Sequence, residues 1–245
     1  MTRNLLRRAA LAALGFAAFA AFAAAPALAQ EEQGAGEASA AFDISATATI
    51  VSDYRYRGVS LSGRDPAAQA SVDVSIGGFY AGIWASSIAR YADSHVEVDL
   101  YAGYAGEAGP ISYEIGAIAY LYPSGDGTGN SYEATGALSY NLGPATARLR
   151  LFYAPDQENL AGDNFYASAD ARFALPGTPV TLFAQFGRER GSSYGRKHDW
   201  SFGAEVARGP FTASLGYFDT DLDGVASGLG RNVGSGIVAS ARFEF

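Results

Sequence analysis

The carboxyl-terminal segment alternates between apolar and polar side chains, and this pattern constrains the fold more than any other feature of the chain. One phase of the segment is wholly apolar and consists of Ile237, Ala239, Ala241, Phe243 and Phe245. The other phase is mostly polar. Because successive side chains of a β-strand point to opposite faces, the segment predicts a strand with one apolar face.

The same two-residue period recurs along the chain. No charged residue occupies an apolar-phase position in any of the segments that show it. We therefore predict twelve strands, at residues 42–50, 68–76, 79–85, 96–104, 111–121, 132–140, 145–153, 165–173, 180–186, 200–206, 211–217 and 237–245.

Two kinds of connection alternate between these segments. Short stretches rich in Gly and Pro, typical of hairpin turns, lie at 77–78, 106–110, 141–144, 176–179 and 208–210. Longer polar stretches lie at 57–66, 87–94, 123–130, 155–164, 188–198 and 219–234. Short turns at one end and long loops at the other are typical of outer-membrane barrels. An even number of strands places both chain ends on the short-turn, periplasmic side.

The amino-terminal region predicts export and divides the chain into three parts. Arg3, Arg7 and Arg8 precede an apolar run, and Ala27-Leu28-Ala29 resembles a cleavage site, so residues 1–29 are expected to be a signal peptide. Residues 30–41 are small, polar and acidic, as in a flexible periplasmic leader. Residues 42–245 are expected to form the barrel.

Alternation alone would also suit a soluble antiparallel sheet. Three features favour a membrane protein. The chain has an export signal, its strands have the length of about 9–11 residues with which a tilted strand crosses a bilayer, and aromatic residues lie near the strand ends. Because hydrocarbon tolerates no unpaired sheet edge, the sheet must close. The predicted fold is all-β: a transmembrane antiparallel up-and-down barrel of about twelve strands, with short periplasmic turns and longer extracellular loops.

Charge and composition exclude several function classes. The chain has 17 Lys and Arg against 25 Asp and Glu, and removing the three signal-peptide arginines leaves 14 − 25 = −11. Such an acidic chain is not expected to bind nucleic acid, which requires a basic face. There is no cysteine, so no disulfide forms. No His, Cys or carboxylate spacing resembles a metal site, and no cofactor is predicted.

The polar phase is expected to line the lumen. Its charged members fall into an acidic arc on the earlier strands and an arginine arc on the later ones, which would create a transverse field in a water-filled channel. The alternative is that these charges pair and seal the interior. The predicted pore-lining residues are Asp73, Glu97, Asp99, Glu114, Glu133, Arg148, Arg150, Asp170, Arg172 and Arg242.

Three loop segments carry weaker signals. Gly191-Ser192-Ser193-Tyr194-Gly195 matches G-x-S-x-G, but it lacks the strand–turn–helix context of a nucleophile elbow, so no catalytic residue is predicted. Asp219 to Gly224 begins like an EF-hand loop yet has Gly230 at its twelfth position, leaving only weak calcium binding open. The basic stretch with Arg188, Arg190, Arg196 and Lys197 is a candidate contact for lipopolysaccharide phosphates.

Two segments resemble known outer-membrane sequences. The terminal Ala241-Arg242-Phe243-Glu244-Phe245 resembles the carboxyl-terminal signal read by the barrel assembly machinery, with Phe243 and Phe245 as its aromatic residues. Residues 52–60 (SDYRYRGVS) resemble the opening motif of the TorF-type porin family, carried here by Ser52, Asp53, Tyr54, Arg57 and Gly58. The resemblance spans roughly 45–245 and implies an outer-membrane location and a porin-like role.

These patterns predict a Gram-negative outer-membrane porin that lets small hydrophilic solutes or ions diffuse passively. Its expected partners are outer-membrane lipids, lipopolysaccharide, the assembly machinery and small polar solutes. A closed structural or surface-interaction barrel without transport is the alternative. A lipase-type outer-membrane enzyme is the reading with the least support, because no site is apparent.

Overall fold

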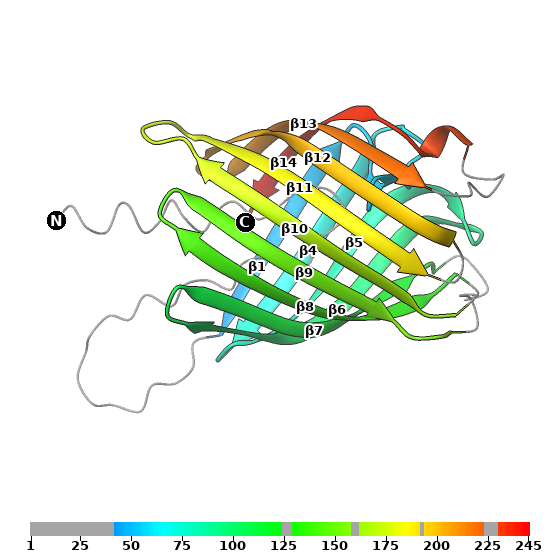
Figure 1. The fold of residues 1–245 in the computed structure, drawn as a ribbon, viewed down its shortest axis with the longest axis horizontal. Helices are drawn as coiled ribbons and strands as arrows, with labels where there is room; N and C mark the ends of the chain where they lie inside the picture. Colours follow the sequence, from blue (N-terminus) through cyan, green and yellow to red (C-terminus); the bar gives the residue numbers. More distant parts are fainter. Residues whose placement is uncertain (1–41, 124–128, 158–161, 192–193, 223–229) are drawn as a thin grey trace.

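The computed structural model describes residues 42–123, 129–157, 162–191, 194–222 and 230–245. Within them the expected barrel is confirmed: twelve antiparallel strands close into a single sheet, each hydrogen-bonded to its neighbours in the chain, with β1 pairing to both β4 and β14 (Figure 1). The predicted signal peptide (1–29) and leader (30–41) lie outside the described residues. No helix of the described part is long and apolar enough to cross a membrane.

The strands follow the predicted segments and extend many of them. The barrel strands are β1 (Asp43–Val51), β4 (Ala67–Ile76), β5 (Phe79–Tyr91), β6 (Ser94–Ala108), β7 (Ile111–Leu121), β8 (Ser131–Leu142), β9 (Ala145–Ala154), β10 (Asn164–Ala174), β11 (Val180–Gly191), β12 (Tyr194–Arg208), β13 (Phe211–Leu222) and β14 (Gly236–Glu244). Two short strands, β2 (Arg55–Tyr56) and β3 (Val59–Ser60), form a separate hairpin, and a 3₁₀ turn, η1 (Gly230–Asn232), precedes β14.

Two of the predicted long loops are strands for most of their length. Residues 87–94 instead complete β5 and β6 around a tight turn, in which Ala92 and Asp93 both have positive φ, as a type I′ turn requires. Residues 188–191 and 194–198 likewise belong to β11 and β12. Strands at this end continue beyond the apolar part of the outer face into segments whose outward side chains are polar, so polarity did not mark where the strands end.

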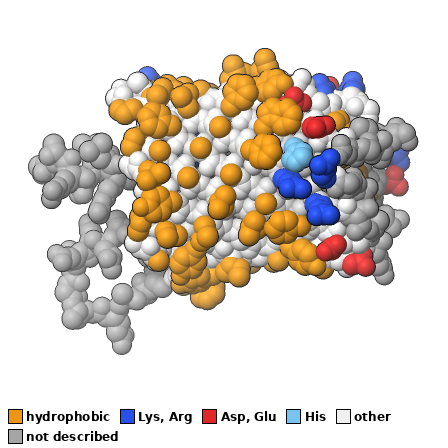
Figure 2. Space-filling view, in the orientation of Figure 1, with side chains coloured by type: hydrophobic (Ala, Val, Ile, Leu, Met, Phe, Trp, Pro, Cys, Tyr) orange, Lys and Arg blue, Asp and Glu red, His pale blue; other side chains and the backbone are white. Residues whose placement is uncertain are grey.

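The outer face of the barrel is apolar, as the alternation predicts. Leu100, Leu149 and Phe202 are each about half exposed, whereas the residues that alternate with them are buried or half-buried. Figure 2 shows these hydrophobic side chains spread over the strands as a broad belt, with charged side chains gathered near the end that carries the longer connections. Such an inside-out arrangement is stable only where the surroundings of the belt are themselves apolar.

Aromatic side chains mark the short-turn end of this belt. Phe79 packs edge-on against Tyr104, which lies beside Tyr113. The two phenylalanines of the terminal signal lie at the same end: the rings of Phe243 and Phe245 are 4.8 Å apart, and both side chains are exposed. This arrangement is typical of an interfacial aromatic girdle.

Substitution of neighbouring residues tests which face meets lipid. Leu100 is 45% exposed on the outer face, whereas Asp99 is 3% exposed on the inner face. If the outer face meets lipid, Leu100→Arg places a charge in hydrocarbon, which costs about 2–4 kcal/mol of folding free energy. Asp99→Arg instead places the charge among carboxylates of the lumen. We expect the heat-modifiable folded fraction recovered from outer membranes to fall sharply for Leu100→Arg and less for Asp99→Arg. Equal yields of the two variants would contradict the assigned faces.

Candidate functional site: a hairpin held inside the barrel

The segment between β1 and β4 folds back into the barrel instead of extending outward as a loop. We call residues 52–62 the plug hairpin. Its strands β2 and β3 pair through Arg55↔Ser60 and Tyr56↔Val59, and the two turn residues, Arg57 and Gly58, have φ of 46° and 82°. This is again the type I′ pattern. The segment was predicted to end the first strand and open an external loop at 57–66, and that expectation was wrong.

Asp53 organises the plug hairpin. Its carboxylate accepts hydrogen bonds from Arg55 Nε at 2.7 Å, Ser60 Oγ at 2.6 Å and Ser62 Oγ at 3.3 Å. The Tyr54 amide donates to Ser62 Oγ at 2.9 Å, which closes the base of the hairpin. A carboxylate bound to several donors at once fixes the path of the chain, because its removal would leave those buried donors unpaired.

Arg57, at the tip of the hairpin, is held between carboxylates of two strands of the wall, β8 and β11. Its guanidinium donates to both Glu133 oxygens on β8, at 2.6 and 2.8 Å, and to Glu189 Oε1 on β11 at 2.5 Å. The Tyr166 ring lies 4.3 Å from its Cζ. Its side chain is only 2% exposed. Burial lowers the pKa of Arg57, but the carboxylates raise it more, so the pKa lies well above its usual value.

Gly58 brings the hairpin against a third part of the wall. A Cβ placed on Gly58 would lie 2.7 Å from Cβ of Thr220 on β13 and 2.9 Å from Cβ of Asp199 on β12. Only glycine therefore fits here, both for its positive φ and for the close approach. Together with Arg57, this contact spans the lumen from β8 to β13.

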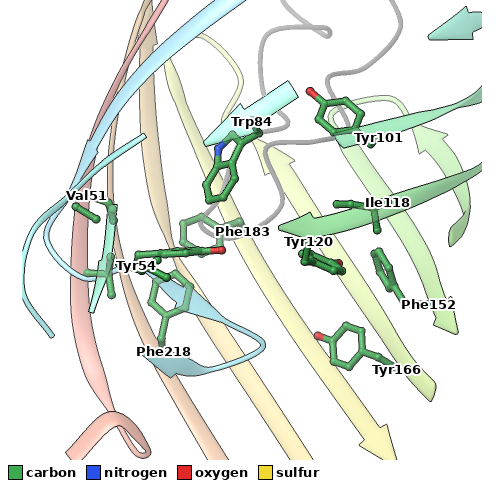
Figure 3. Packing of buried hydrophobic residues seen from close by; sticks show 13 residues of the cluster. Val51, Tyr54, Trp84, Tyr101, Ile118, Tyr120, Phe152, Tyr166, Phe183 and Phe218 are labelled. Carbon is green, nitrogen blue, oxygen red and sulfur yellow. The ribbon is translucent and has the colours of Figure 1, made fainter. Parts of the chain in front are cut away.

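Tyr54 anchors the near side of the hairpin. Its hydroxyl donates to Glu97 Oε1 on β6 at 3.0 Å, and its ring lies 5.4 Å from that of Trp84 on β5 in an edge-on arrangement. Figure 3 shows Tyr54 and Trp84 directed into the barrel, where Phe183 and Phe218 belong to the same buried cluster. An aromatic and ion-paired cluster thus lies inside the lumen at this level, with Tyr54 fully buried.

A second group of charges lies nearer the short-turn end, and we call it the lower ring. It consists of the ion pairs Arg148–Glu114 at 2.7 Å, Arg150–Asp170 at 2.6 Å and Arg172–Glu205. Signs therefore alternate around the wall. In this ring the predicted separation into one acidic arc and one arginine arc does not hold, because Asp170 and Glu205 lie among the arginines.

Part of the lower ring is more exposed than the plug hairpin, although Arg148 and Glu205 are buried as well. The side chains of Arg150 and Asp170 are 17% and 20% exposed, against 2% for Arg57. Tyrosine rings at this level lie along the wall: Tyr101 covers Gly82, and Tyr80 covers Gly103 and Gly116, where any Cβ would collide with the ring. A ring that lies over a strand glycine takes little of the lumen's width.

One stretch of wall is acidic without a counter-ion. On β4 and β6, Asp73 accepts from the hydroxyl of Tyr101 and Glu97 from Tyr54, and neither forms an ion pair with a described residue. Asp99, two residues from Glu97 on the same face, is 3% exposed, and its Oδ1 has no hydrogen-bond partner among the described residues. We call Asp73, Glu97 and Asp99 the acidic wall.

The structure places all of the predicted pore-lining residues on the inner face. Glu133 meets the plug hairpin, the acidic wall contains three others, and Arg242 is half-buried on β14 across from Thr49 of β1. The remainder belong to the lower ring: Glu114, Arg148, Arg150, Asp170 and Arg172.

Sequence reasoning missed inner residues near the longer-loop end. Glu189 and Lys197 form a buried ion pair, and Asp199 accepts from the Tyr166 hydroxyl at 3.1 Å. Extending the two-residue phase of β11 and β12 past Phe186 and Trp200 would have found them, since Glu189 has the parity of Phe183. Lys197 therefore does not belong to a basic surface loop.

The weaker motifs do not form sites in the described residues. Gly191 and Tyr194 pair across the β11–β12 hairpin, Ser192 and Ser193 lie outside the described residues, and His198 stacks on Phe186. Asp219 to Leu222 are part of β13, so the EF-hand-like reading is wrong for this part, while Asp223 and Gly224 lie outside the described residues. No group of metal-ligating side chains is found in the described part.

Comparisons with known proteins agree with this architecture. Residues 35–241 match the model of a family described as a bacterial protein of unknown function (Gcw_chp). No curated protein sequence matches the chain. The solved KdgM porin has a TM-score of 0.58 at 9% identity, covering 82% of this chain and 99% of that one. A structure of KdgM porin in complex with disordered oligogalacturonate gives 0.54 at 10% identity, covering 82% and 98%. The chain has the fold of outer-membrane porins.

Proposed function

This chain belongs to the Gcw_chp family of bacterial proteins, whose function is not known, and we propose that it is an outer-membrane channel for passive diffusion of small hydrophilic solutes or ions. The plug hairpin is its constriction. The fold of outer-membrane porins supports the channel. The observation that carries the constriction is Arg57, which is held between Glu133 and Glu189 and is more buried than Arg150 and Asp170 of the lower ring.

Small cations and neutral solutes are the favoured cargo. The arginines of the lower ring are each paired with a carboxylate, so they offer little net positive charge to an anion. The acidic wall, by contrast, carries carboxylates without counter-ions, and Asp73, the least buried of the three, is the one that a cation in the lumen can reach. KdgM has been solved in complex with oligogalacturonate, and that binding is a property of KdgM. The paired arginines of this chain do not favour a polyanion.

Planar bilayers test this function. Purified protein should give discrete conductance steps, and a salt gradient should give a reversal potential of cation-selective sign. Reversing Arg148 and Arg150 to Glu should increase that selectivity, because both substitutions add carboxylates to the lumen. Anion selectivity would contradict the role of the acidic wall.

The second candidate function is a closed structural or surface-interaction barrel. The burial of the plug hairpin favours it, since Tyr54 is fully buried and Arg57 nearly so. If the protein gives no conductance in planar bilayers and liposomes that contain it do not swell in small sugars, the closed-barrel function is supported and the channel proposal is rejected.

The same proposal includes an outer-membrane location, chain ends on the periplasmic side and a terminal assembly signal. It also includes kinship with the TorF-type porins. Because the chain has no cysteine, a single introduced cysteine is the only site at which a maleimide reagent labels it. Asp93→Cys, in the exposed β5–β6 turn, should react with an impermeant maleimide on intact cells, whereas Glu107→Cys, near the β6–β7 turn, should react only after the outer membrane is permeabilised. The opposite pattern would reverse the orientation.

A further inference from the structure

Basic side chains gather on the outer face of β11 and β12, just past the apolar belt. Along β11 the outward residues run from Leu182 and Phe186 to Arg188 and Arg190, so the change from apolar to basic occurs within two residues. Figure 2 shows blue side chains grouped beside a histidine at this edge of the hydrophobic belt.

Strand pairing shows that these residues form one surface. Arg188 pairs with His198 across β11 and β12, and Arg190 pairs with Phe165 on β10. Arg196 is also exposed, two residues from His198 on the same face of β12. We call Arg188, Arg190, Arg196 and His198 the basic patch. On its far side, Asp221 of β13 pairs with His198 and ends the patch.

The patch lies at the depth of lipid headgroups. Phe186 pairs with Trp200 one step nearer the belt, and the His198 ring stacks on Phe186 at 5.8 Å. Aromatic residues of this kind sit at the boundary between hydrocarbon and headgroups. The guanidinium groups of Arg188 and Arg190 extend beyond that boundary, at the end of the barrel opposite the chain termini.

We propose that the basic patch binds the phosphate groups of lipopolysaccharide in the outer leaflet. Arginine suits a phosphate because its planar guanidinium donates two parallel hydrogen bonds to the oxygens. Basic residues near an anionic headgroup layer are attracted to it, and the basic patch faces outward at that level. The inference rests on the proposed outer-membrane location and orientation, but not on channel activity.

The test measures lipopolysaccharide affinity of the full mature chain in non-ionic detergent. The double variant Arg188→Gln, Arg190→Gln should bind fluorescent lipopolysaccharide on the order of tenfold or more weakly than the unsubstituted protein. Removing the lipid A phosphates enzymatically should weaken binding to the unsubstituted protein by a similar factor. Heat-modifiability should be unchanged in the variant, because both side chains are exposed.

Two single variants serve as matched controls. Arg90 lies at the same end of the barrel, but its guanidinium already pairs with Asp93 at 2.7 Å. Arg208 is exposed at the short-turn end, on the β12–β13 turn. Arg90→Gln and Arg208→Gln should leave the affinity unchanged. Equal loss in these controls, or full affinity in the double variant or for dephosphorylated lipopolysaccharide, would overturn the proposal. Binding with silent bilayers would overturn the channel alone.

Discussion

Replacing Arg57 with glutamine is expected to raise the single-channel conductance of this barrel severalfold. Glutamine removes the positive charge shared by Glu133 and Glu189, which leaves Glu133 buried without the cation it binds. Removing one partner of a buried ion pair costs about 3–5 kcal/mol. That loss falls on the docked hairpin and not on the barrel ladder, so the hairpin should leave its position while the barrel stays folded.

Two further variants define the effect of Arg57→Gln. Arg57→Lys keeps the charge but loses the two-oxygen contact with Glu133, so its conductance should lie between that of the unsubstituted protein and that of Arg57→Gln. Arg90→Gln breaks an exposed ion pair and should change nothing, because such pairs contribute about 0–1 kcal/mol. Unsubstituted conductance in Arg57→Gln, with normal folding, would show that Arg57 does not hold the constriction.

Gly58→Ala is expected to expose the plug hairpin to protease. The left-handed backbone costs alanine about 1–2 kcal/mol, and its Cβ would also collide with Thr220 and Asp199 in the barrel wall. The hairpin should therefore open more often, and trypsin added from outside should cleave after Arg55 or Arg57 faster than in the unsubstituted protein.

Gly109→Ala is the control for a glycine of positive φ outside the hairpin. Gly109 has φ of 64°, but nothing lies within 4 Å of its hypothetical Cβ. It should pay the same backbone cost with no change in trypsin cleavage of the hairpin. If the two variants resist trypsin equally, neither the backbone conformation of Gly58 nor its contact with the β12–β13 wall holds the hairpin.

The barrel itself could be predicted because a two-residue period acts locally. The alternation within each strand identifies its inner and outer face, as in residues 237–245. Closure of the sheet was predicted because an unpaired sheet edge is not tolerated in a membrane. The strand ends were harder. Past the apolar part of the outer face the outward side chains become polar, so Arg188 and Arg190 were predicted to lie in a loop although they continue β11.

The candidate site could be predicted only in part. The opening motif singled out Asp53, Tyr54, Arg57 and Gly58, but a motif does not say where its segment folds. The plug hairpin depends on partners 76 and 132 residues away in the chain, Glu133 and Glu189. No local pattern specifies such contacts. The same holds for the lower ring, whose pairs join strands that are not all neighbours.

The central claim is that residues 52–62 constrict an otherwise passable barrel, and one comparison tests it most directly. Sugar flux into proteoliposomes should be measured for the unsubstituted chain and for a chain whose residues 53–61 are replaced by a Gly/Ser linker of equal length. The account predicts slow entry of small sugars through the first and much faster entry through the second, at equal amounts of folded barrel. Equal flux through both would contradict it.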